Sequence, residues 1–395
     1  MNASVPFPIP IDKNSPFSLS NLPFGIFSTR ANLGLGHRRR AATERTSIRT
    51  SIIENLSTAT SPIFTDAKLN TGVFTPMAEV EMHMPMRVTD YTDSFSSLIH
   101  AQNCLHPLGL EIPSALTEYP MGYNGRVSTL CVSGTQVIRP QGYFVNEGDR
   151  RPTFQETKQL DFEVELGAFI SKPIPTGTRI NAKEAADHIF GYVLLNDWSA
   201  RDIQKYEMPP LGPFHSKGFI TTISPWIVTL DALRYSMHQP PPSNSTDIHP
   251  MLVADDSNHG VYDIQFSAKI TRGTDRLVEL VRSSFTDSYW SIPQMIAYQS
   301  SSLIGLHTGD LVASGTISSK PPATTDNSSS GTIAGNGCLL EVFAQKHVLP
   351  AIDGKPMSWL QDGDELTMEG WFPTSDGGRA GFGPLTSLVV PALKI

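Results

Sequence analysis

The string LDFEVELGAFI at residues 160–170 places Asp161, Glu163 and Glu165 in strict alternation with apolar residues. Such alternation is typical of a half-buried β-strand with its carboxylates on one face. Glu163 and Glu165 would repel each other there, and in a dry site one of them would have to take up a proton. A divalent cation bound between them removes the conflict, and Asp161 is expected to lie outside that site. The ordinary alternative is a surface strand whose polar side chains face solvent.

A further acid, Asp197, stands in GYVLLNDWSARDIQKYE, where an apolar strand is predicted to end and a helix to begin. Counted along a helix from Asp197, Arg201, Gln204 and Met208 follow on one stripe. An acid at a strand end with Arg and Gln on the same stripe is suited to lining a pocket. The alternative is an N-capping Asp followed by a surface Arg.

The segment TDYTDSFSSLIHAQN contains Asp93 and His100, which would share one face of a helix. The rise between them would be about 10 Å. At that separation His100 would not bind the same ion as Asp93, but it would reach a substrate lying beside that ion. The alternative is a histidine packed for structural reasons on a half-apolar helix.

Four acids therefore form a candidate metal site made only of oxygen ligands. Hard ligands of this kind select Mg²⁺ or Ca²⁺, with Mn²⁺ as a further candidate, and not Zn²⁺. No organic cofactor is expected, because the glycine clusters at 33–36 and 376–383 do not lie between a strand and a helix. The four acids are Asp93, Glu163, Glu165 and Asp197.

Composition favours a soluble, loop-rich enzyme over a nucleic-acid or membrane protein. The chain has 395 residues, a net charge of −8 and 39% hydrophobic residues, and its 30 Gly and 31 Pro separate short strand-like runs. The basic run at 37–40 is too short for a nucleic-acid patch, and no apolar run is long enough to cross a bilayer. The first residues lack the apolar core of a secretory signal, so a cytoplasmic location is expected. The three cysteines are widely spaced and predict neither a disulfide framework nor a CxxC metal site.

The elements that would position these residues are mostly strands. Residues up to about 85 are weakly periodic and predict a small, partly ordered region. Helices are predicted near 94–104, 182–189, 198–207 and 288–304, with Asn181 as an N-cap. Strands are predicted at STLCVSG, FEVELGAFI, GYVLLND, SPWIVTL, YDIQFSAKI, DLVASGTI, LLEVFA, DELTMEGW and TSLVVPA.

The chain resembles the fumarylacetoacetases, hydrolases of C–C bonds that act in tyrosine catabolism. The resemblance covers nearly everything after residue 82, in the same order. It implies a mixed β-sandwich roll as catalytic domain over 86–395, a reduced SH3-like N-terminal region over 1–85, a β-rich α+β fold overall, and a homodimer. The matching strings include NLPFGIFST, MHMP, GYNGR, LDFEVELGAF, HIFGYVLLNDWSARDIQKYE, LGPFHSKGF, TISPWIV and GDLVASGTIS.

The resemblance also implies roles for individual residues. Asp93, Glu163, Glu165 and Asp197 would bind the metal, and Lys217 and Thr221 match, with Asp197, a second cation site. His100 matches the catalytic base, Glu341 the acid that orients it and Arg201 the third member, with Lys217 also catalytic. The positions that match substrate contacts are Phe95, Tyr123, Gln204, Met208 and Thr316.

These residues suit the hydrolysis of a β-dicarbonyl C–C bond. His100 would take a proton from water, which attacks one carbonyl, while a metal-stabilised enolate departs. Three departures from the family pattern concern the substrate: Phe95 and Met208 stand where the family has tyrosines, and Gly109 falls where an arginine is expected. Losing a hydroxyl that binds a buried polar group costs about 1–3 kcal/mol.

We therefore expect a divalent-metal-dependent hydrolase acting on a fumarylacetoacetate-like or polyketide-like small molecule that is less acidic, in a specialised or secondary pathway. One alternative is an ordinary fumarylacetoacetase. Another is a decarboxylase, tautomerase or cyclase that uses the same enolate chemistry. The last is a non-catalytic, metal-stabilised binding protein.

Overall fold

The structure, a computed structural model, describes residues 6–12, 15–29, 42–239, 248–254, 260–273, 277–321, 332–352 and 355–394. The basic run at 37–40 lies outside these residues. None of the described helices is long and apolar enough to cross a membrane.

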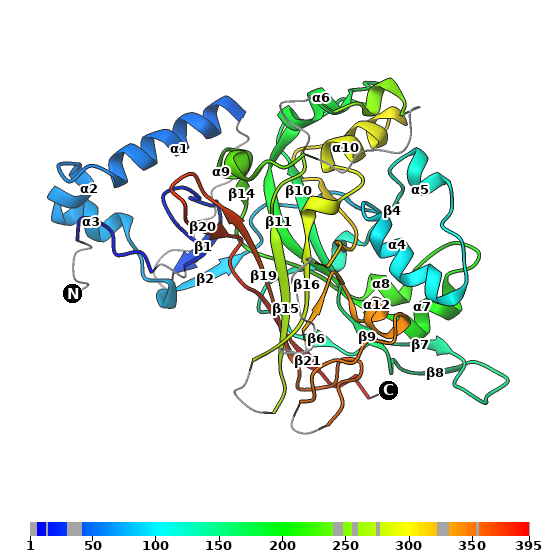
Figure 1. Cartoon of the computed structure of the whole chain (residues 1–395). Helices are drawn as coiled ribbons and strands as arrows, with labels where there is room; N and C mark the ends of the chain where they lie inside the picture. The colour runs from blue at the N-terminus through cyan, green and yellow to red at the C-terminus, as the bar shows by residue number, and fades with distance from the viewer. Residues whose placement is uncertain are drawn as a thin grey trace.

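Two large mixed sheets form the centre of the molecule (Figure 1). Within the described residues, the first sheet has eight strands. In spatial order they are β4 (Gly122–Asn124), β3 (Tyr91–Ser94), β17 (Leu311–Ala313), β10 (Val164–Ile170), β11 (Ile189–Asp197), β13 (Thr221–Ile223) and β5 (Leu130–Val132), with β14 (Val228–Thr229) also paired to β11.

The second sheet has seven strands, again within the described residues. Their order is β18 (Ile333–Ala334), β16 (Val278–Ser284), β15 (Gln265–Thr271), β19 (Glu365–Pro373), β21 (Leu385–Val390) and β6 (Val137–Ile138), with β20 (Arg379–Gly381) paired to β19. Three two-stranded ladders complete the strands: β1 (Ile26–Thr29) with β2 (Val80–His83), β7 (Gln141–Phe144) with β8 (Thr153–Glu156), and β9 (Leu160–Asp161) with β12 (Ser199–Ala200).

One continuous apolar core joins the two large sheets. Leu166 and Leu194 from the first sheet and Phe266 and Leu366 from the second belong to the same buried cluster. Inward-facing side chains of two stacked sheets interdigitate in this way in a sandwich. The β-rich α+β fold expected from the sequence is thus confirmed.

The strand β10 is buried on both faces and not half-exposed. Leu166 and Ala168 pack in the core between the sheets, while Phe169 belongs to a second core on the opposite face with Leu195 and Leu311. Side chains two apart share a face, so Glu165 lies on the face that carries this second core. The predicted continuous strand from Leu160 is wrong in one respect: it breaks at Phe162 and Glu163, between β9 and β10.

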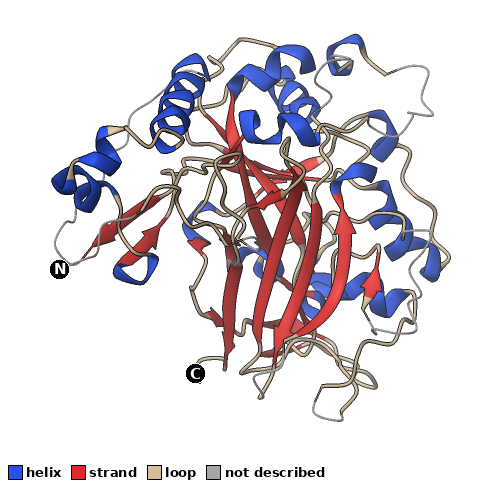
Figure 2. Ribbon diagram, turned by 60° about the vertical axis from the view of Figure 1, so that its left-hand side comes forward, coloured by secondary structure: helices blue, strands red, loops and turns tan. Residues whose placement is uncertain are grey.

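Helices surround the sheets, chiefly at one end and along one side (Figure 2). They are α1 (Ala42–Leu56), α2 (Pro62–Thr65), α3 (Ala67–Val73), α4 (Leu98–Leu105), α5 (Ala115–Glu118), α6 (Ala182–Ala185), α7 (Arg201–Glu207), α8 (His215–Gly218), α9 (Leu230–Leu233), α10 (Ile292–Ser301) and α12 (Leu339–Ala344). Asn181 caps α6 through a capping box with Glu184, as predicted.

The strand predicted at LLEVFA is wrong, because these residues form helix α12. Cys338 is its N-cap, and Glu341, three residues later, closes a capping box. A short apolar run does not distinguish a strand from a buried helix by periodicity. The cap residues, and not the run itself, decide between the two.

The N-terminal region is more regular than predicted. Along the chain, helices α1, α2 and α3 follow β1 and precede β2, which pairs with β1, and this region lies at one side of the large sheets (Figure 1). The Arg45 side chain of α1 bonds to Asp231 at 3.2 Å and to the carbonyl oxygens of Ile189 and Phe190, at the start of β11. This region therefore packs on the large sheets, and the domain boundary at residue 85 stays a prediction.

Replacing Gly191 by Ala is expected to lower the free energy of unfolding by about 1–3 kcal/mol, because the site is overpacked. A β-carbon there would overlap the Val228 carbonyl oxygen and lie 2.8 Å from Ile227 Cγ2. Gly72→Ala in α3 is the matched control: nothing lies within 4 Å of its β-carbon, so no loss is expected. Urea unfolding measures both, and equal stabilities of the two variants would contradict this packing.

Candidate active site

Three carboxylates meet where neighbouring strands of the first sheet come together. Asp93 lies in β3, Glu165 in β10 and Asp197 at the end of β11. Strand β17 lies between β3 and β10, and β10 pairs with β11, so these segments are close in space although far apart in sequence. One oxygen from each residue lies within 4.8 Å of the others, and all three side chains are buried.

Two members of this cluster, Asp93 and Glu165, have buried carboxylate oxygens without hydrogen bonds from any described residue. Among the described residues, Asp93 Oδ1 and both carboxylate oxygens of Glu165 have no hydrogen-bond partner. Burial and the neighbouring acids raise the pKa of Asp93 and of Glu165 well above the usual values. Unpaired buried charge is costly, and a hard divalent cation is the group that satisfies an all-oxygen set. The three residues therefore fit a Mg²⁺ or Ca²⁺ ion.

Lys217 supplies part of the compensation. Its ammonium donates to Asp197 Oδ2 at 2.6 Å and also to Glu163 Oε2. Burial opposes ionisation of Glu163, but Lys217 and Arg201 outweigh burial and hold its pKa below the usual range. Thr221 donates to Asp197 Oδ1 at 2.9 Å. Glu163 is therefore ion-paired with Lys217 and Arg201 and is not a member of the three-carboxylate cluster.

Asp161 connects the strands to helix α12. Its carboxylate accepts from Arg201 Nε at 2.8 Å and from the backbone N–H groups of Leu339 and Leu340 at 2.8 and 3.0 Å. Arg201 also pairs with Glu163 Oε1 at 2.8 Å. Asp161 lies outside the three-carboxylate cluster, as the sequence predicted, and it holds Arg201 and the start of α12 together.

His100 and Glu341 face each other from two helices. The His100 Nδ1 to Glu341 Oε1 distance is 3.4 Å, and Ser97 caps α4 by accepting from the His100 N–H. Burial opposes protonation of His100, but Cys104 and Glu341 outweigh it and raise the His100 pKa well above the usual value. The ring of Phe95 lies 5.5 Å from that of His100.

Glu341 is fixed by several donors that sequence reasoning did not identify. Asn103 and Ser318 donate to Oε1 at 2.8 and 2.7 Å, and the Gly337 N–H donates to Oε2 at 2.7 Å. Asn103 stands three residues after His100 on α4, a spacing that places both on one helical face. That spacing is the one feature of the sequence that would have suggested Asn103 as a residue of the site.

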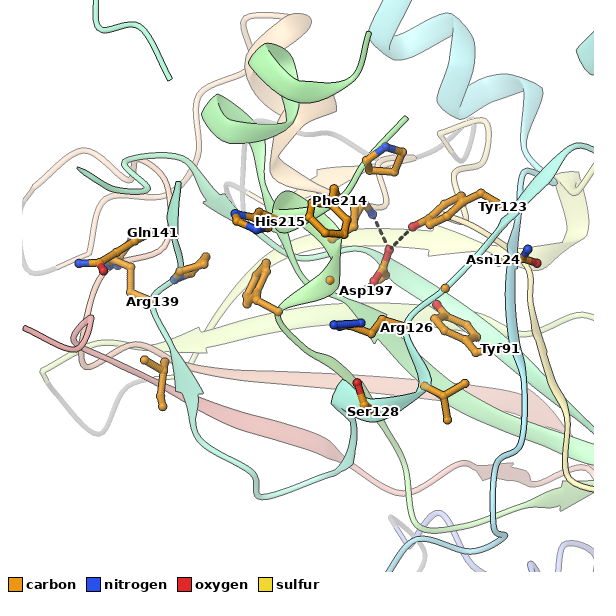
Figure 3. Close-up of a pocket in the computed structure, with 18 residues that line it drawn as sticks. Tyr91, Tyr123, Asn124, Arg126, Ser128, Arg139, Gln141, Asp197, Phe214 and His215 are labelled. Carbon is orange, nitrogen blue, oxygen red and sulfur yellow. Dashed lines mark hydrogen bonds and ion pairs between the residues drawn. The ribbon is translucent and has the colours of Figure 1, made fainter. Parts of the chain in front are cut away.

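A cavity of about 660 Å³ opens beside the carboxylates (Figure 3). Tyr123 points toward Asp197 and donates to its Oδ2 at 3.2 Å. Lys217 also lines this cavity, as do Arg126 and Phe214, which the sequence did not suggest. Of the site residues predicted from the sequence, Tyr123, Asp197 and Lys217 line this cavity. The others do not: these are Asp93, Phe95, His100, Glu163, Glu165, Arg201, Gln204, Met208, Thr221, Thr316 and Glu341.

These remaining residues are placed as follows. Gln204 accepts from Arg201 Nη1 at 3.0 Å. Met208 is the C-cap of α7 and is 41% exposed. Thr316 is buried and lies against Gly337.

Two predicted spacings are wrong, because each was counted along a helix that does not include both residues. Asp93 and His100 do not share a helix, because Asp93 lies in β3 and α4 begins at Leu98. Asp197 does not share the stripe of α7 either, because it ends β11 and the helix begins at Arg201. Periodicity counted through a strand end gives the wrong side-chain directions.

The sequence profile described as fumarylacetoacetate (FAA) hydrolase C-terminal matches residues 96–390, which contain the site. The chain belongs to the fumarylacetoacetate hydrolase family. It is 39% identical to the fumarylacetoacetase of Arabidopsis thaliana over 87% of this chain and 79% of the relative. It is 34% identical to the fumarylacetoacetase fahA of Aspergillus fumigatus over 98% of each chain. The chain is also similar to the structure of a fumarylacetoacetate hydrolase from Exiguobacterium antarcticum, at 16% identity, with a TM-score of 0.45 and 80% of each chain covered.

Saturating Mg²⁺ is expected to stabilise the wild-type protein, by about 2.7 kcal/mol at 100 times its dissociation constant. Glu165→Gln should lose most of this gain, because it removes a charged ligand from the centre of the cluster. Chemical unfolding with and without Mg²⁺ measures the difference.

The control variant is Asp90→Asn, which alters a separate group formed with His307 and Asp310, whose Asp90 and His307 are exposed. This variant should keep the full stabilisation by Mg²⁺. An undiminished gain in Glu165→Gln would show that the ion binds elsewhere.

Proposed function

We propose that this family member is a divalent-metal-dependent hydrolase that cleaves a C–C bond of a β-dicarbonyl compound. The observation that carries the proposal is the buried cluster of Asp93, Glu165 and Asp197, with unpaired oxygens, beside the His100–Glu341 pair. His100 is close enough to Glu163 for its charge to lower the Glu163 pKa. The cation and the base would therefore serve one substrate.

His100 is suited to activate water. Glu341 is held as an anion although burial opposes this, because the charge of His100 and the hydrogen bonds from His100, Ser318 and Asn103 lower its pKa. It would accept the Nδ1–H of His100 and leave Nε2 free to take a proton from water. The hydroxide formed in this way would attack one carbonyl of the substrate.

Lys217 is suited to stabilise negative charge on the substrate. An ammonium has three donors, and the hydrogen bonds to Glu163 and Asp197 use two of them. The third is free to meet an oxyanion as the C–C bond breaks. Arg201 holds Glu163 and Asp161 in place. A bound Mg²⁺ or Ca²⁺ would supply Lewis-acid stabilisation of the enolate that departs.

The substrate is proposed to be less acidic than fumarylacetoacetate, in a specialised or secondary pathway. Phe95 lies against His100 and lacks a hydroxyl, and Met208 has no hydrogen-bonding group at the end of α7. The second candidate is fumarylacetoacetate itself, because the curated relatives at 39% and 34% identity are named fumarylacetoacetases. A homodimer and a cytoplasmic location remain predictions.

His100→Ala is expected to lower kcat for β-diketone hydrolysis by about 10²–10⁴-fold, as for loss of a general base. Glu341→Gln should move the acidic limb of the kcat–pH profile to lower pH. The reason is that the base must be neutral, and Glu341 raises the His100 pKa. His106→Ala at the end of α4 is the control and should leave both kcat and the profile unchanged. A profile unchanged in Glu341→Gln would exclude the pairing.

The double variant Phe95→Tyr/Met208→Tyr should raise kcat/KM for fumarylacetoacetate relative to a neutral β-diketone. Each restored hydroxyl is worth about 1–3 kcal/mol, or roughly 5- to 150-fold. Steady-state kinetics on both substrates measure the ratio, with the exposed Phe27→Tyr as control. A wild-type enzyme that already prefers fumarylacetoacetate, with no gain in the variant, would favour the second candidate.

A further inference from the structure

We propose that His100, Cys338 and Glu341 form a second metal site, specific for Zn²⁺ and similar borderline-soft ions, whose occupation blocks the catalytic base. A nitrogen, a sulfur and an oxygen atom from these three residues lie within 4.8 Å of one another, and all three residues are buried. The site differs from the carboxylate cluster in residues and in donor chemistry.

Two separations are close to those around tetrahedral zinc, although they run to different oxygens of Glu341. With Zn–N and Zn–O near 2.1 Å and Zn–S near 2.3 Å, tetrahedral geometry places N and O about 3.4 Å apart and S and O about 3.6 Å apart. The His100 Nδ1 to Glu341 Oε1 distance is 3.4 Å, and the Cys338 Sγ to Glu341 Oε2 distance is 3.4 Å. A turn of the Glu341 carboxylate that brings one oxygen near both the His100 nitrogen and the Cys338 sulfur would complete this geometry.

A second thiol lies at the fourth side of the site. Cys104 Sγ is 3.9 Å from both ring nitrogens of His100, one helical turn away on α4. Cys104 and a water molecule are thus the candidates for the fourth ligand. This site was not predictable from the sequence, because the three cysteines are widely spaced along the chain. Folding places two of them, Cys104 and Cys338, near His100.

Local structure fixes Cys338 firmly. It is the N-cap of α12, and its backbone bridges Glu163 while the Gly337 carbonyl accepts from the Val164 N–H. The capping box places Glu341 beside its sulfur. A rigid sulfur and a rigid carboxylate reduce the entropy that a metal ion would otherwise have to overcome.

The carboxylate cluster and the His100–Cys338–Glu341 site should differ in the metal ions that they prefer. Asp93, Glu165 and Asp197 offer only oxygen, which suits Mg²⁺ and Ca²⁺. A thiolate and an imidazole prefer Zn²⁺ and Co²⁺. On binding, the ion takes the place of the Cys338 thiol proton and of the proton on the His100 ring nitrogen that it binds; both protons pass to solvent, and no oxidation or reduction occurs. His100 then uses a lone pair on the metal and cannot accept a proton from water.

The decisive test is titration of the protein with Co²⁺ in the presence of saturating Mg²⁺, which occupies the oxygen site. The wild type should develop the near-ultraviolet absorption of a Co²⁺–thiolate bond, and Zn²⁺ should abolish it by displacement. Cys338→Ser should lose the band. Serine is a favoured N-cap, so helix α12 is expected to be retained.

Cys131→Ser is the matched control, because Cys131 lies in β5, outside the metal group formed by His100, Cys338 and Glu341. It should keep the wild-type spectrum. A band that persists in Cys338→Ser, or no band in the wild type, would overturn the site. Thermal unfolding of each variant confirms that it is folded.

The inhibitory role rests on the proposed function, whereas the Co²⁺ spectrum does not. With Mg²⁺ in excess, Zn²⁺ should inhibit the wild type and Cys131→Ser, and Cys338→Ser should require more than roughly tenfold more Zn²⁺, as expected when a ligand is lost. Equal sensitivity of Cys338→Ser would overturn the inhibitory role. An enzyme inactive on every β-diketone but showing the Cys338-dependent band would refute the proposed hydrolysis and leave the metal site standing.

Discussion

Burial of carboxylates at the meeting point of strands β3, β10 and β11 is the constraint on which the rest of the structure depends. Removing an ionised carboxylate from water is expensive unless a partner replaces the lost hydration. The chain supplies partners for some of these groups: Lys217 for Glu163 and Asp197, and Arg201 for Asp161 and Glu163. Glu165 receives none among the described residues. The cluster at this point therefore fits a cation, which would supply the missing partner.

The same constraint organises the acid–base half of the site. Asp161 binds the first N–H groups of α12 and also Arg201, so the helix that carries Glu341 is tied to the residues around Glu163. Glu341 then faces His100 on α4. In this way the base on α4 and the orienting acid on α12 are held at fixed positions relative to the strands. Displacement of Asp161 would disturb both halves together.

The sequence was most useful for predicting functional residues that lie together in one short string. The acids of FEVE and the Asp after YVLLN are predicted as metal ligands by their alternation together with the family resemblance. The structure groups Glu165 and Asp197 with Asp93, whereas Glu163 pairs with Lys217 and Arg201. Side-chain directions across element ends were not predictable. Asp93 and His100 were placed on one helix, although Ser97 starts a new element between them.

Contacts between distant segments were also beyond the sequence. LLEVFA was predicted as a strand because its apolar run masks the capping box of Cys338 and Glu341. The meeting of Cys104 and Cys338 at His100 depends on packing of α12 against α4, which no local pattern encodes. In both cases tertiary contacts, and not local preference, decide the outcome.

The most direct measurement of the central claim is anomalous diffraction from a crystal of the protein grown with Mn²⁺ as a substitute for Mg²⁺. The account predicts an anomalous peak among Asp93, Glu165 and Asp197, within coordination distance of the Glu165 oxygens. A peak at Asp90, His307 and Asp310 with none at the buried carboxylates would contradict it.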